Sequence, residues 1–258
     1  MTIAGFEELD YAMTPLGELI LRRREVLSLN RAEVFEVKLD GALLMSSIVN
    51  EAEKALVRLA MPLPAGPRCD VLIGGLGLGY TAKAALEVDR IASVTVIEFL
   101  ERVIRWHLDE RVPLGRTLTK DGRCHLVHGD FFAAVGSPGL SSDASSGPNP
   151  DMPDSQALAH IATTRFHAIL LDIDHSPQSL LHAAHATFYT EAGFKRLVDH
   201  IEPGGVFALW SADRPDESLI NALSGAFADV GVRDVNFYNP MLDLHDVNYI
   251  VVARRAAR

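Results

Sequence analysis

The sequence predicts an α/β fold, with a Rossmann-like, mostly parallel sheet covered by helices on both faces and a small N-terminal β-hairpin subdomain. Three observations predict it. From residue 69 onward, short apolar runs alternate with segments of helical periodicity. These runs are apolar almost throughout, which is typical of parallel strands buried on both faces. Finally, a glycine-rich turn joins the first of them directly to a helix.

The first 62 residues have a different pattern. Strands are expected at residues 17–27, 33–39 and 42–45. Asp40-Gly41 supplies two residues that tolerate positive φ, as a tight hairpin turn requires. Residues 46–61 repeat apolar side chains at spacings of three and four, which predicts a helix that prolines then end. We therefore expect a β-subdomain with a linking helix at residues 1–62 and a Rossmann-like domain at residues 63–258.

The larger domain is expected to contain five parallel strands and a closing antiparallel pair. The parallel strands are expected at residues 71–75, 92–97, 125–128, 166–171 and 206–210. The antiparallel pair is expected at residues 232–237 and 248–253. Helices are expected at residues 80–87, 100–108, 191–201 and 219–230. A turn is expected at residues 202–205, where Pro and Gly precede the fifth strand.

One segment interrupts this alternation of strands and helices. Residues 136–156 are rich in Ser, Pro, Gly and Asp and contain little apolar surface to bury. Unstructured connections longer than about 12–15 residues are uncommon inside compact domains. We therefore expect a flexible loop here, and a surface insertion is favoured over an active-site lid.

Composition excludes several classes of protein. The chain has 258 residues and is 48% hydrophobic, which is enough to build a packed core. It has 24 Lys and Arg against 34 Asp and Glu, and this net charge of −10 disfavours nucleic-acid and membrane partners. The N-terminus is acidic, unlike a signal peptide. The two cysteines have no metal-binding spacing, so a cytoplasmic protein with reduced thiols is expected.

The glycine-rich turn is the strongest functional signal. Its glycines, which let the backbone approach a ligand before a helix N-terminus, are Gly74, Gly75, Gly77 and Gly79. Glu98 ends the second strand, nineteen residues after Gly79, where a carboxylate can accept hydrogen bonds from both ribose hydroxyls. Together these residues predict a nucleoside site.

Acids also follow the next two parallel strands. Asp130 comes just after the third strand, and Asp172, Asp174 and His175 follow the fourth. Because ligands bind at the carboxyl edge of an open α/β sheet, these side chains are expected to share one site with the glycine-rich turn.

Two other groups of residues receive a structural interpretation. His182 and His185 have no cysteine or carboxylate at ligand spacing, so we expect polar positions on an exposed helix and no metal site. Arg22, Arg23 and Arg24 form a short basic run, for which a solvated edge strand is favoured over an anion site.

The combined motifs resemble class I S-adenosylmethionine-dependent transferases and, more narrowly, the spermidine synthase (polyamine aminopropyltransferase) family. The narrower resemblance rests on Ile73-Gly74-Gly75 at the glycine turn and Leu39-Asp40-Gly41 in the N-terminal hairpin. It implies a donor co-substrate, S-adenosylmethionine or its decarboxylated form, and a small amine as acceptor, with no metal. A homodimer is left open.

The resemblance also implies roles for the residues at the carboxyl edge. The turn from Gly75 to Gly79 would lie against the donor, and Glu98 would hold its ribose. Asp130 would bind the adenine amino group, and Asp172 would be the acid beside the attacking amine.

The amine acceptor must be unprotonated when it attacks. Deprotonating an alkylammonium group with a pKa near 10.4 costs about 4–5 kcal/mol at pH 7. Asp172 is therefore expected to be the catalytic proton acceptor, and Asp174 or His175 could share the role.

Three departures from the family pattern bear on the donor. The family motif GGGDGG is GGLGLG here, which replaces an acid by Gly77. The motif DSSDP becomes DIDHSP at residues 172–177, which displaces the second acid, and Leu44 replaces a glutamine. Without the acid at residue 77, we expect methyl transfer from S-adenosylmethionine to be slightly favoured over aminopropyl transfer from the decarboxylated donor. A non-catalytic nucleoside-binding protein is the third hypothesis.

Overall fold

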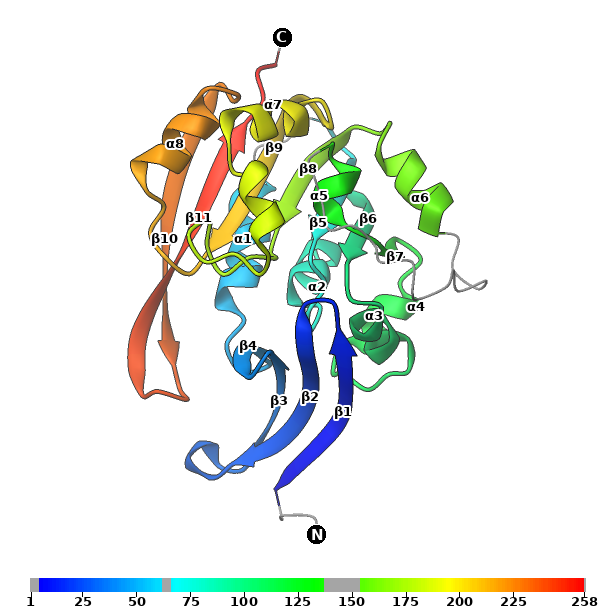
Figure 1. Ribbon diagram of the computed structural model, residues 1–258, viewed down its shortest axis with the longest axis vertical. Coiled ribbons are helices and arrows are strands. Elements are labelled where there is room, and N and C mark those ends of the chain that lie inside the picture. Colours follow the sequence, from blue (N-terminus) through cyan, green and yellow to red (C-terminus); the bar gives the residue numbers. More distant parts are fainter. Residues whose placement is uncertain (1–4, 62–65, 137–153, 258) are drawn as a thin grey trace.

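The computed structural model describes residues 5–61, 66–136 and 154–257 and places them in two sheets (Figure 1). The N-terminal sheet is antiparallel, with the order β1-β2-β3-β4. Its strands are β1 (Phe6–Thr14), β2 (Gly17–Val26), β3 (Ala32–Leu39) and β4 (Ala42–Ser46). The predicted hairpin is confirmed, since Asp40 and Gly41 have φ values of 48° and 80° between β3 and β4. The additional strand β1 was not predicted, because acids and exposed side chains obscure its alternation.

The larger sheet has seven strands in the order β10-β11-β9-β8-β5-β6-β7. Its parallel strands are β5 (Cys69–Gly74), β6 (Ile91–Glu98), β7 (Cys124–His128), β8 (Phe166–Leu171) and β9 (Ile201–Ser211). The antiparallel pair is β10 (Asp229–Asn239) and β11 (Leu244–Arg254). The predicted Rossmann-like sheet is confirmed. Because β5 pairs with β6 on one side and β8 on the other, the chain reverses its winding direction there, and ligands bind at such a point.

Helices cover both faces of this sheet, as predicted. They are α1 (Glu51–Ala60), α2 (Tyr80–Leu86), α3 (Glu101–Leu108), α4 (Gly115–Lys120), α5 (Phe131–Ala134), α6 (Asp154–Ile161), α7 (Glu191–Val198) and α8 (Glu217–Ser224), with short 3-10 helices η1 (Leu27–Leu29) and η2 (Ala183–Thr187). Side chains of β5 alternate between the two cores: Val71 and Ile73 pack with α1 to α4, and Leu72 packs with α5 to α8. Among the described helices, none is both long enough and apolar enough to span a bilayer.

Three expected boundaries are corrected. The linking helix α1 begins at Glu51, because residues as far as Ser46 still pair with β3. It packs against α2, β9 and β11, and so covers the larger sheet. Residues 202–205, expected to be a turn, lie within β9, where the register with β8 shifts and Gly204 has a φ of 75°. Most of the expected loop at 136–156 lies outside the described residues, but its last residues begin α6.

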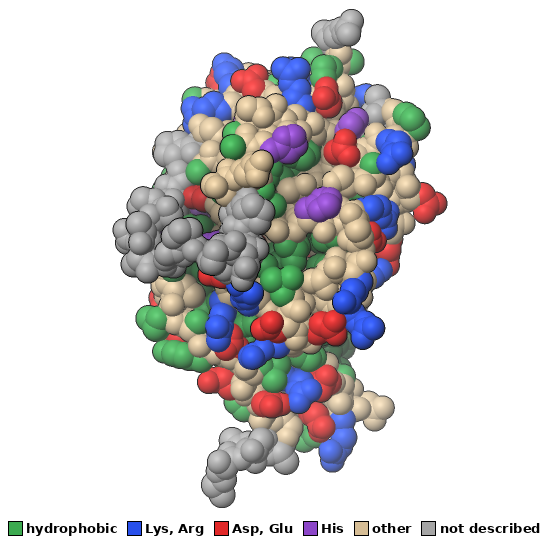
Figure 2. All heavy atoms as spheres, turned by 90° about the vertical axis from the view of Figure 1, so that its right-hand side faces the viewer, with side chains coloured by type: hydrophobic (Ala, Val, Ile, Leu, Met, Phe, Trp, Pro, Cys, Tyr) green, Lys and Arg blue, Asp and Glu red, His purple; other side chains and the backbone are tan. Residues whose placement is uncertain are grey.

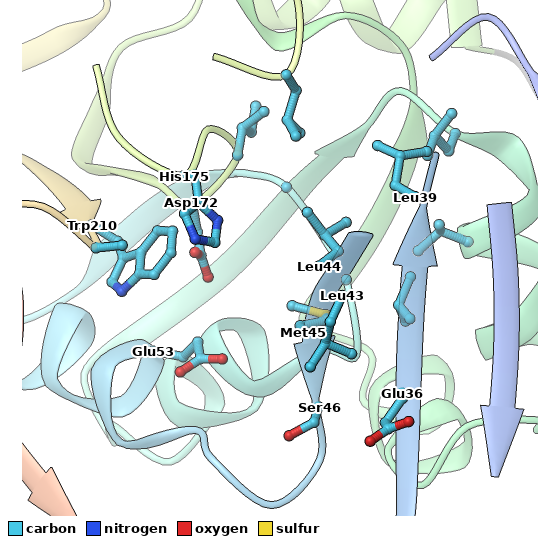
Figure 3. A pocket seen from close by; sticks show the side chains of 18 of the residues that line it. Glu36, Leu39, Leu43, Leu44, Met45, Ser46, Glu53, Asp172, His175 and Trp210 are labelled. Atoms are coloured by element: carbon cyan, nitrogen blue, oxygen red, sulfur yellow. The ribbon is translucent and has the colours of Figure 1, made fainter. Parts of the chain in front are cut away.

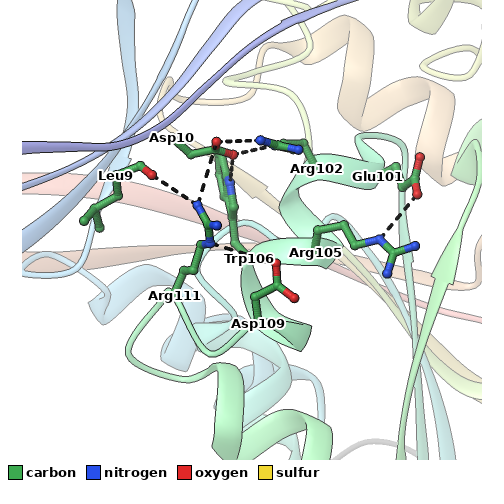
Figure 4. A network of polar contacts seen from close by, with 8 residues as sticks. All are labelled: Leu9, Asp10, Glu101, Arg102, Arg105, Trp106, Asp109 and Arg111. Carbon is green, nitrogen blue, oxygen red and sulfur yellow. Dashed lines mark hydrogen bonds and ion pairs between the residues drawn. The ribbon is translucent and has the colours of Figure 1, made fainter.

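A buried acid joins the N-terminal sheet to the Rossmann-like part (Figure 4). The carboxylate of Asp10 on β1 accepts hydrogen bonds from Arg102 Nη2 and Trp106 Nε1, both at 2.6 Å. Burial acts to raise the pKa of Asp10, but the hydrogen bonds from Arg102 and Trp106 outweigh it and lower the pKa. Arg111 Nη1 donates to the carbonyl of Leu9 at 3.2 Å. These contacts hold the N-terminal sheet against α3.

The outer surface of the N-terminal sheet carries charges of both signs. Figure 2 shows Lys or Arg and Asp or Glu side chains interspersed over the lower part of that face. Arg23, for example, forms ion pairs with Glu7 at 2.5 Å and with Glu33 at 3.2 Å. This face therefore presents no single-sign patch there.

Candidate active site

A cavity of about 740 Å³ lies between the carboxyl edge of the larger sheet and the N-terminal sheet (Figure 3). Of the predicted site residues, it is lined by Gly75, Gly77, Glu98, Asp130, Asp172 and His175. Leu43, Leu44 and Met45 of β4 form part of the opposite wall. Residues at the ends of β5, β6 and β8 and Asp130, which follows β7, therefore line one cavity.

Two predicted glycines lie outside the cavity lining and have packing roles. A Cβ atom on Gly74 would come within 2.8 Å of the Phe131 ring and 2.9 Å of Leu171. A Cβ atom on Gly79 would come within 2.6 Å of Leu118. These two glycines allow the close approach of neighbouring side chains to the turn.

Gly75 and Gly77 shape the turn itself. Gly75 has a φ of 93°, and a Cβ atom there would collide with the backbone carbonyl oxygen of Asp172. Gly77 has a φ of 49°, and a Cβ atom would lie 2.5 Å from the sulfur of Met45. The same sulfur accepts a hydrogen bond from the Leu78 N–H at 3.1 Å. Met45 therefore occupies the space that a side chain at residue 77 would need.

His107 contacts the backbone of the glycine-rich turn. It is fully buried, and burial lowers its pKa to about 4, so the ring is neutral at physiological pH. A hydrogen bond of 2.9 Å joins His107 Nε2 to the carbonyl oxygen of Gly77, which requires the proton on Nε2. His107 has no sequence signal for this role, because its partner is a backbone atom thirty residues away.

Glu98 lies at the end of β6 and is buried beneath the glycine turn. Its Oε2 accepts a hydrogen bond from Leu76 N at 2.9 Å, and its Oε1 accepts one from Leu100 N at 2.8 Å. Burial raises the pKa of Glu98, and these backbone hydrogen bonds partly oppose that rise. A carboxylate oxygen can accept more than one hydrogen bond, so Glu98 can hold the turn and also accept from a ligand hydroxyl.

Asp130 caps the next helix along the edge. Its Oδ1 accepts hydrogen bonds from Phe132 N at 2.8 Å and Ala133 N at 3.3 Å, at the start of α5. This capping fixes the carboxyl group at the cavity wall.

Asp172 follows β8 and faces an acid that the sequence analysis did not identify. Asp172 Oδ2 accepts a hydrogen bond from Thr81 Oγ1 at 2.7 Å. Glu53 of α1 lines the same cavity, and Figure 3 shows the two carboxyl groups on the same side of the β4 side chains. An acid in the first turn of a helix is ordinary, so Glu53 has no distinctive sequence signal.

The two carboxyl groups affect one another electrostatically. Burial raises the pKa of Asp172 to about 6, although the Thr81 hydrogen bond lowers it. Burial also raises the pKa of Glu53 to about 8, and repulsion from the Asp172 charge adds to that rise. Near neutral pH the pair therefore retains one proton and carries about one negative charge.

Asp174, which was expected to share the catalytic role of Asp172, does not lie at the cavity with it. It is buried, and it does not line the cavity. Its Oδ1 accepts from Leu181 N at 2.8 Å and lies 2.7 Å from His185 Nδ1, and its Oδ2 accepts from Tyr189 Oη at 2.8 Å. These contacts hold the Asp174 carboxylate in a buried hydrogen-bond network outside the cavity lining.

The two histidines of the HxxH spacing do not lie on an exposed α-helix. His182 caps η2, whereas His185 is buried against Asp174, so the expected solvent-exposed pair is corrected. Within the described ranges, no cluster of three His, Cys, Asp or Glu side chains could hold a metal ion.

His175 lines the cavity next to an indole ring. Its ring centroid lies 5.8 Å from that of Trp210 in an edge-on arrangement, and Trp210 Nε1 donates to Asn248 Oδ1 at 3.3 Å. Figure 3 shows His175 and Trp210 on the same side of the cavity as Asp172. These rings form the aromatic part of the wall beside the acid pair.

Comparison with protein-family models gives no match, and comparison with curated protein sequences gives none either. Solved structures do match. A spermidine synthase in complex with the transition state analogue AdoDATO has a TM-score of 0.67 and 16% identity, over 97% of this chain and 73% of that one. Spermidine synthase from Thermotoga maritima has a TM-score of 0.65 and 16% identity, with the same coverage.

A third match extends the likeness to a further organism. A probable spermidine synthase from Corynebacterium glutamicum has a TM-score of 0.57 and 14% identity, over 98% of this chain and 81% of that one. All three matches include both the N-terminal sheet and the Rossmann-like sheet, since they span almost the whole chain. The protein therefore has a spermidine synthase-like fold.

Proposed function

We propose that this protein is a transferase that moves an aminopropyl group from decarboxylated S-adenosylmethionine to a small amine. The observation that carries the proposal is the pair of carboxyl groups, Glu53 and Asp172, in the cavity between the glycine-rich turn and the N-terminal sheet. The likeness of fold to spermidine synthases supports the same reaction class.

The donor would lie along the carboxyl edge of the sheet. The backbone at Gly75 and Gly77, which both line the cavity, would lie against its alkyl chain. Glu98 would accept hydrogen bonds from the ribose hydroxyls, and Asp130 would accept one from the adenine amino group. This placement brings the sulfonium toward Asp172 at the end of the neighbouring strand.

The chemical step needs alignment more than covalent assistance. The amine nitrogen attacks the carbon bonded to the sulfonium, the new C–N bond forms as the C–S bond breaks, and a neutral thioether leaves. Asp172 would take the proton that the acceptor's ammonium group must lose before attack. A carboxylate whose pKa is raised by burial is a better proton acceptor than an ordinary one. The positively charged sulfonium nearby lowers the pKa of the amine.

Methyl transfer from S-adenosylmethionine is a second candidate, because residue 77 is glycine and offers no acid to the donor's ammonium group. The acid pair favours the decarboxylated donor instead, since it adds negative charge where an intact donor would bring a carboxylate. We expect calorimetric titration to show about tenfold tighter binding of the decarboxylated donor. Tighter binding of S-adenosylmethionine would replace this proposal by methyl transfer.

A direct assay separates both reactions from a non-catalytic role. The protein would be incubated with each donor and a mixture of small amines, and the nucleosyl thioether product measured. We expect 5′-methylthioadenosine from the decarboxylated donor. S-adenosylhomocysteine would indicate methyl transfer, and donor binding without either product would indicate a nucleoside-binding protein.

Replacement of Glu98 tests the proposed ribose contact. Glu98→Ala is expected to weaken donor binding by about 1.5–3 kcal/mol, the usual contribution of a charge-assisted hydrogen bond. Because Leu76 N and Leu100 N also lose their buried acceptor, the free energy of unfolding should fall by about 2 kcal/mol as well. Glu98→Gln is the matched control, since its amide oxygen can still accept from the turn. Unchanged donor affinity in Glu98→Ala would remove this residue from the site.

A further inference from the structure

Two arginines of the N-terminal sheet face the cavity. Arg22 and Arg24 lie two residues apart on β2, which places them on one face of the strand, with Arg23 on the other. Because β2 lies between β1 and β3, the expectation of a solvated edge strand for this basic run is wrong.

Both arginines bind one buried carboxylate. Arg22 Nε lies 2.5 Å from Glu36 Oε2, and Arg24 Nε lies 2.9 Å from Glu36 Oε1. Glu36 is 1% exposed, whereas the side chains of Arg22 and Arg24 are 25% and 29% exposed. Among the described acids, Glu36 is the one within ion-pair distance of either arginine.

The charges of this cluster do not balance. Two guanidinium groups and one carboxylate leave one positive charge at the cavity wall. Each guanidinium has five N–H donors, and the bonds to Glu36 use few of them. One carboxylate can accept from two arginines, but Glu36 neutralises only one of the two positive charges, so the remaining charge and N–H donors are available to a second anion.

The cavity therefore has two differently charged regions. Glu53 and Asp172 supply negative charge in one region, and Arg22 and Arg24 are the only Lys or Arg among its described lining residues. Figure 3 shows Glu36 separated from Glu53 and Asp172 by the side chains of β4. Leu43, Leu44 and Met45 make this intervening wall apolar. A molecule that reaches from the acid pair, past this apolar wall, to the two arginines would have a cationic end, an apolar middle and an anionic end.

We propose that Arg22 and Arg24 form an anion subsite for a carboxylate of the acceptor, and that the acceptor is an amino acid whose reacting amine and carboxylate are separated by an alkyl chain. This proposal rests on the proposed function. The planar guanidinium groups suit a carboxylate, which can accept two parallel hydrogen bonds. A simple diamine would instead place its second ammonium beside the surplus positive charge.

The unmodified protein gives the first test. Its activity would be compared with ω-amino acids from 3-aminopropanoate to 6-aminohexanoate, and with the n-alkylamine and the diamine of each chain length. We expect one amino acid to have a kcat/KM at least about tenfold above both matched amines. Equal activity with the alkylamine, or a preference for the diamine, would overturn the subsite.

Variants on the two faces of β2 give the second test. Arg22→Gln is expected to raise the KM for the best amino acid by about 10- to 100-fold, with kcat and the KM for the alkylamine within about twofold. Arg23→Gln is the matched control, because it makes the same charge change on the opposite face, where Arg23 pairs with Glu7. Equal effects of both variants would make the arginine cluster structural. Arg22→Lys keeps the charge, so its KM for the best amino acid should lie between those of the wild type and Arg22→Gln. An intermediate value would show that the effect of Arg22→Gln does not come from misfolding.

A binding measurement separates this proposal from the proposed function. Calorimetry with 5′-methylthioadenosine present would measure binding of the best-bound amino acid without any turnover. Binding that is lost in Arg22→Gln supports the subsite even if no amine is alkylated, in which case the proposed function alone fails. If alkylamines react while amino acids neither bind nor react, the subsite alone fails. A loss of affinity for intact S-adenosylmethionine in Arg22→Gln would assign the arginines to the donor and overturn the acceptor proposal.

Discussion

Asp172→Asn is expected to reduce turnover by about 100-fold or more while donor affinity stays within about twofold. The substitution keeps the shape of the side chain, and its amide oxygen can still accept the hydrogen bond that Thr81 now gives to Asp172. It removes the proton acceptor beside the attacking amine. A single-turnover assay with saturating donor measures the chemical step directly, and near-normal turnover would show that Asp172 only follows β8 and takes no part in the reaction.

The pH dependence gives the same prediction a second readout. Because Asp172 accepts a proton only when ionised, and burial raises its pKa to about 6, kcat/KM should fall as pH drops below that value. The residual activity of Asp172→Asn should not show this decline. Glu53→Gln is the matched control: burial and the Asp172 charge raise the pKa of Glu53 to about 8, so Glu53 is already neutral where Asp172 titrates, and the acidic limb should stay in place. An acidic limb that persists in Asp172→Asn would assign it to another group.

The periodicity of the sequence was sufficient to predict the larger sheet. Parallel strands buried on both faces are apolar throughout, and β8 begins and ends at the predicted residues. The strand β1 escaped prediction because its acids serve contacts made far away in the chain: Asp10 binds Arg102 and Trp106 of α3. The pattern of residues within β1 contains no information about partners that lie so far away in the chain.

The part of the candidate site that lies at the ends of the parallel strands could be predicted from the sequence. Glu98, Asp130 and Asp172 line one cavity because parallel strands place their carboxyl ends at one edge. Glu53 could not be predicted, since it reaches that edge from α1 through tertiary packing. The departures at residues 44 and 77 were visible in the sequence, but only the structure shows Met45 over Gly77.

Spacing alone also could not separate Asp172 from Asp174. The two residues follow the same strand, and the direction of each side chain depends on partners elsewhere. Asp172 meets Thr81 of α2 at the cavity, whereas Asp174 meets groups between residues 181 and 189. We therefore expect substitution of Asp174 to lower stability and substitution of Asp172 to lower turnover.

Asp174→Ala is expected to lower the free energy of unfolding by about 3 kcal/mol, which corresponds to about 6–12 °C in the thermal midpoint for a domain of this size. The truncation leaves Leu181 N, His185 Nδ1 and the Tyr189 hydroxyl without their shared acceptor in a buried site. Burial and the Asp174 charge raise the pKa of Tyr189, so its hydroxyl remains a proton donor that needs a partner.

The same measurement on Asp172→Asn and Asp174→Asn completes this test. Asp174→Asn keeps one acceptor oxygen and should lose about 1 kcal/mol, less than Asp174→Ala. Asp172→Asn should leave the midpoint nearly unchanged, because Thr81 keeps an acceptor. Thermal unfolding followed by circular dichroism measures all three variants, and turnover is assayed well below each midpoint. If Asp174→Ala kept the wild-type midpoint yet lost turnover as Asp172→Asn does, Asp174 would act in the reaction itself and not as the acceptor of a buried hydrogen-bond network.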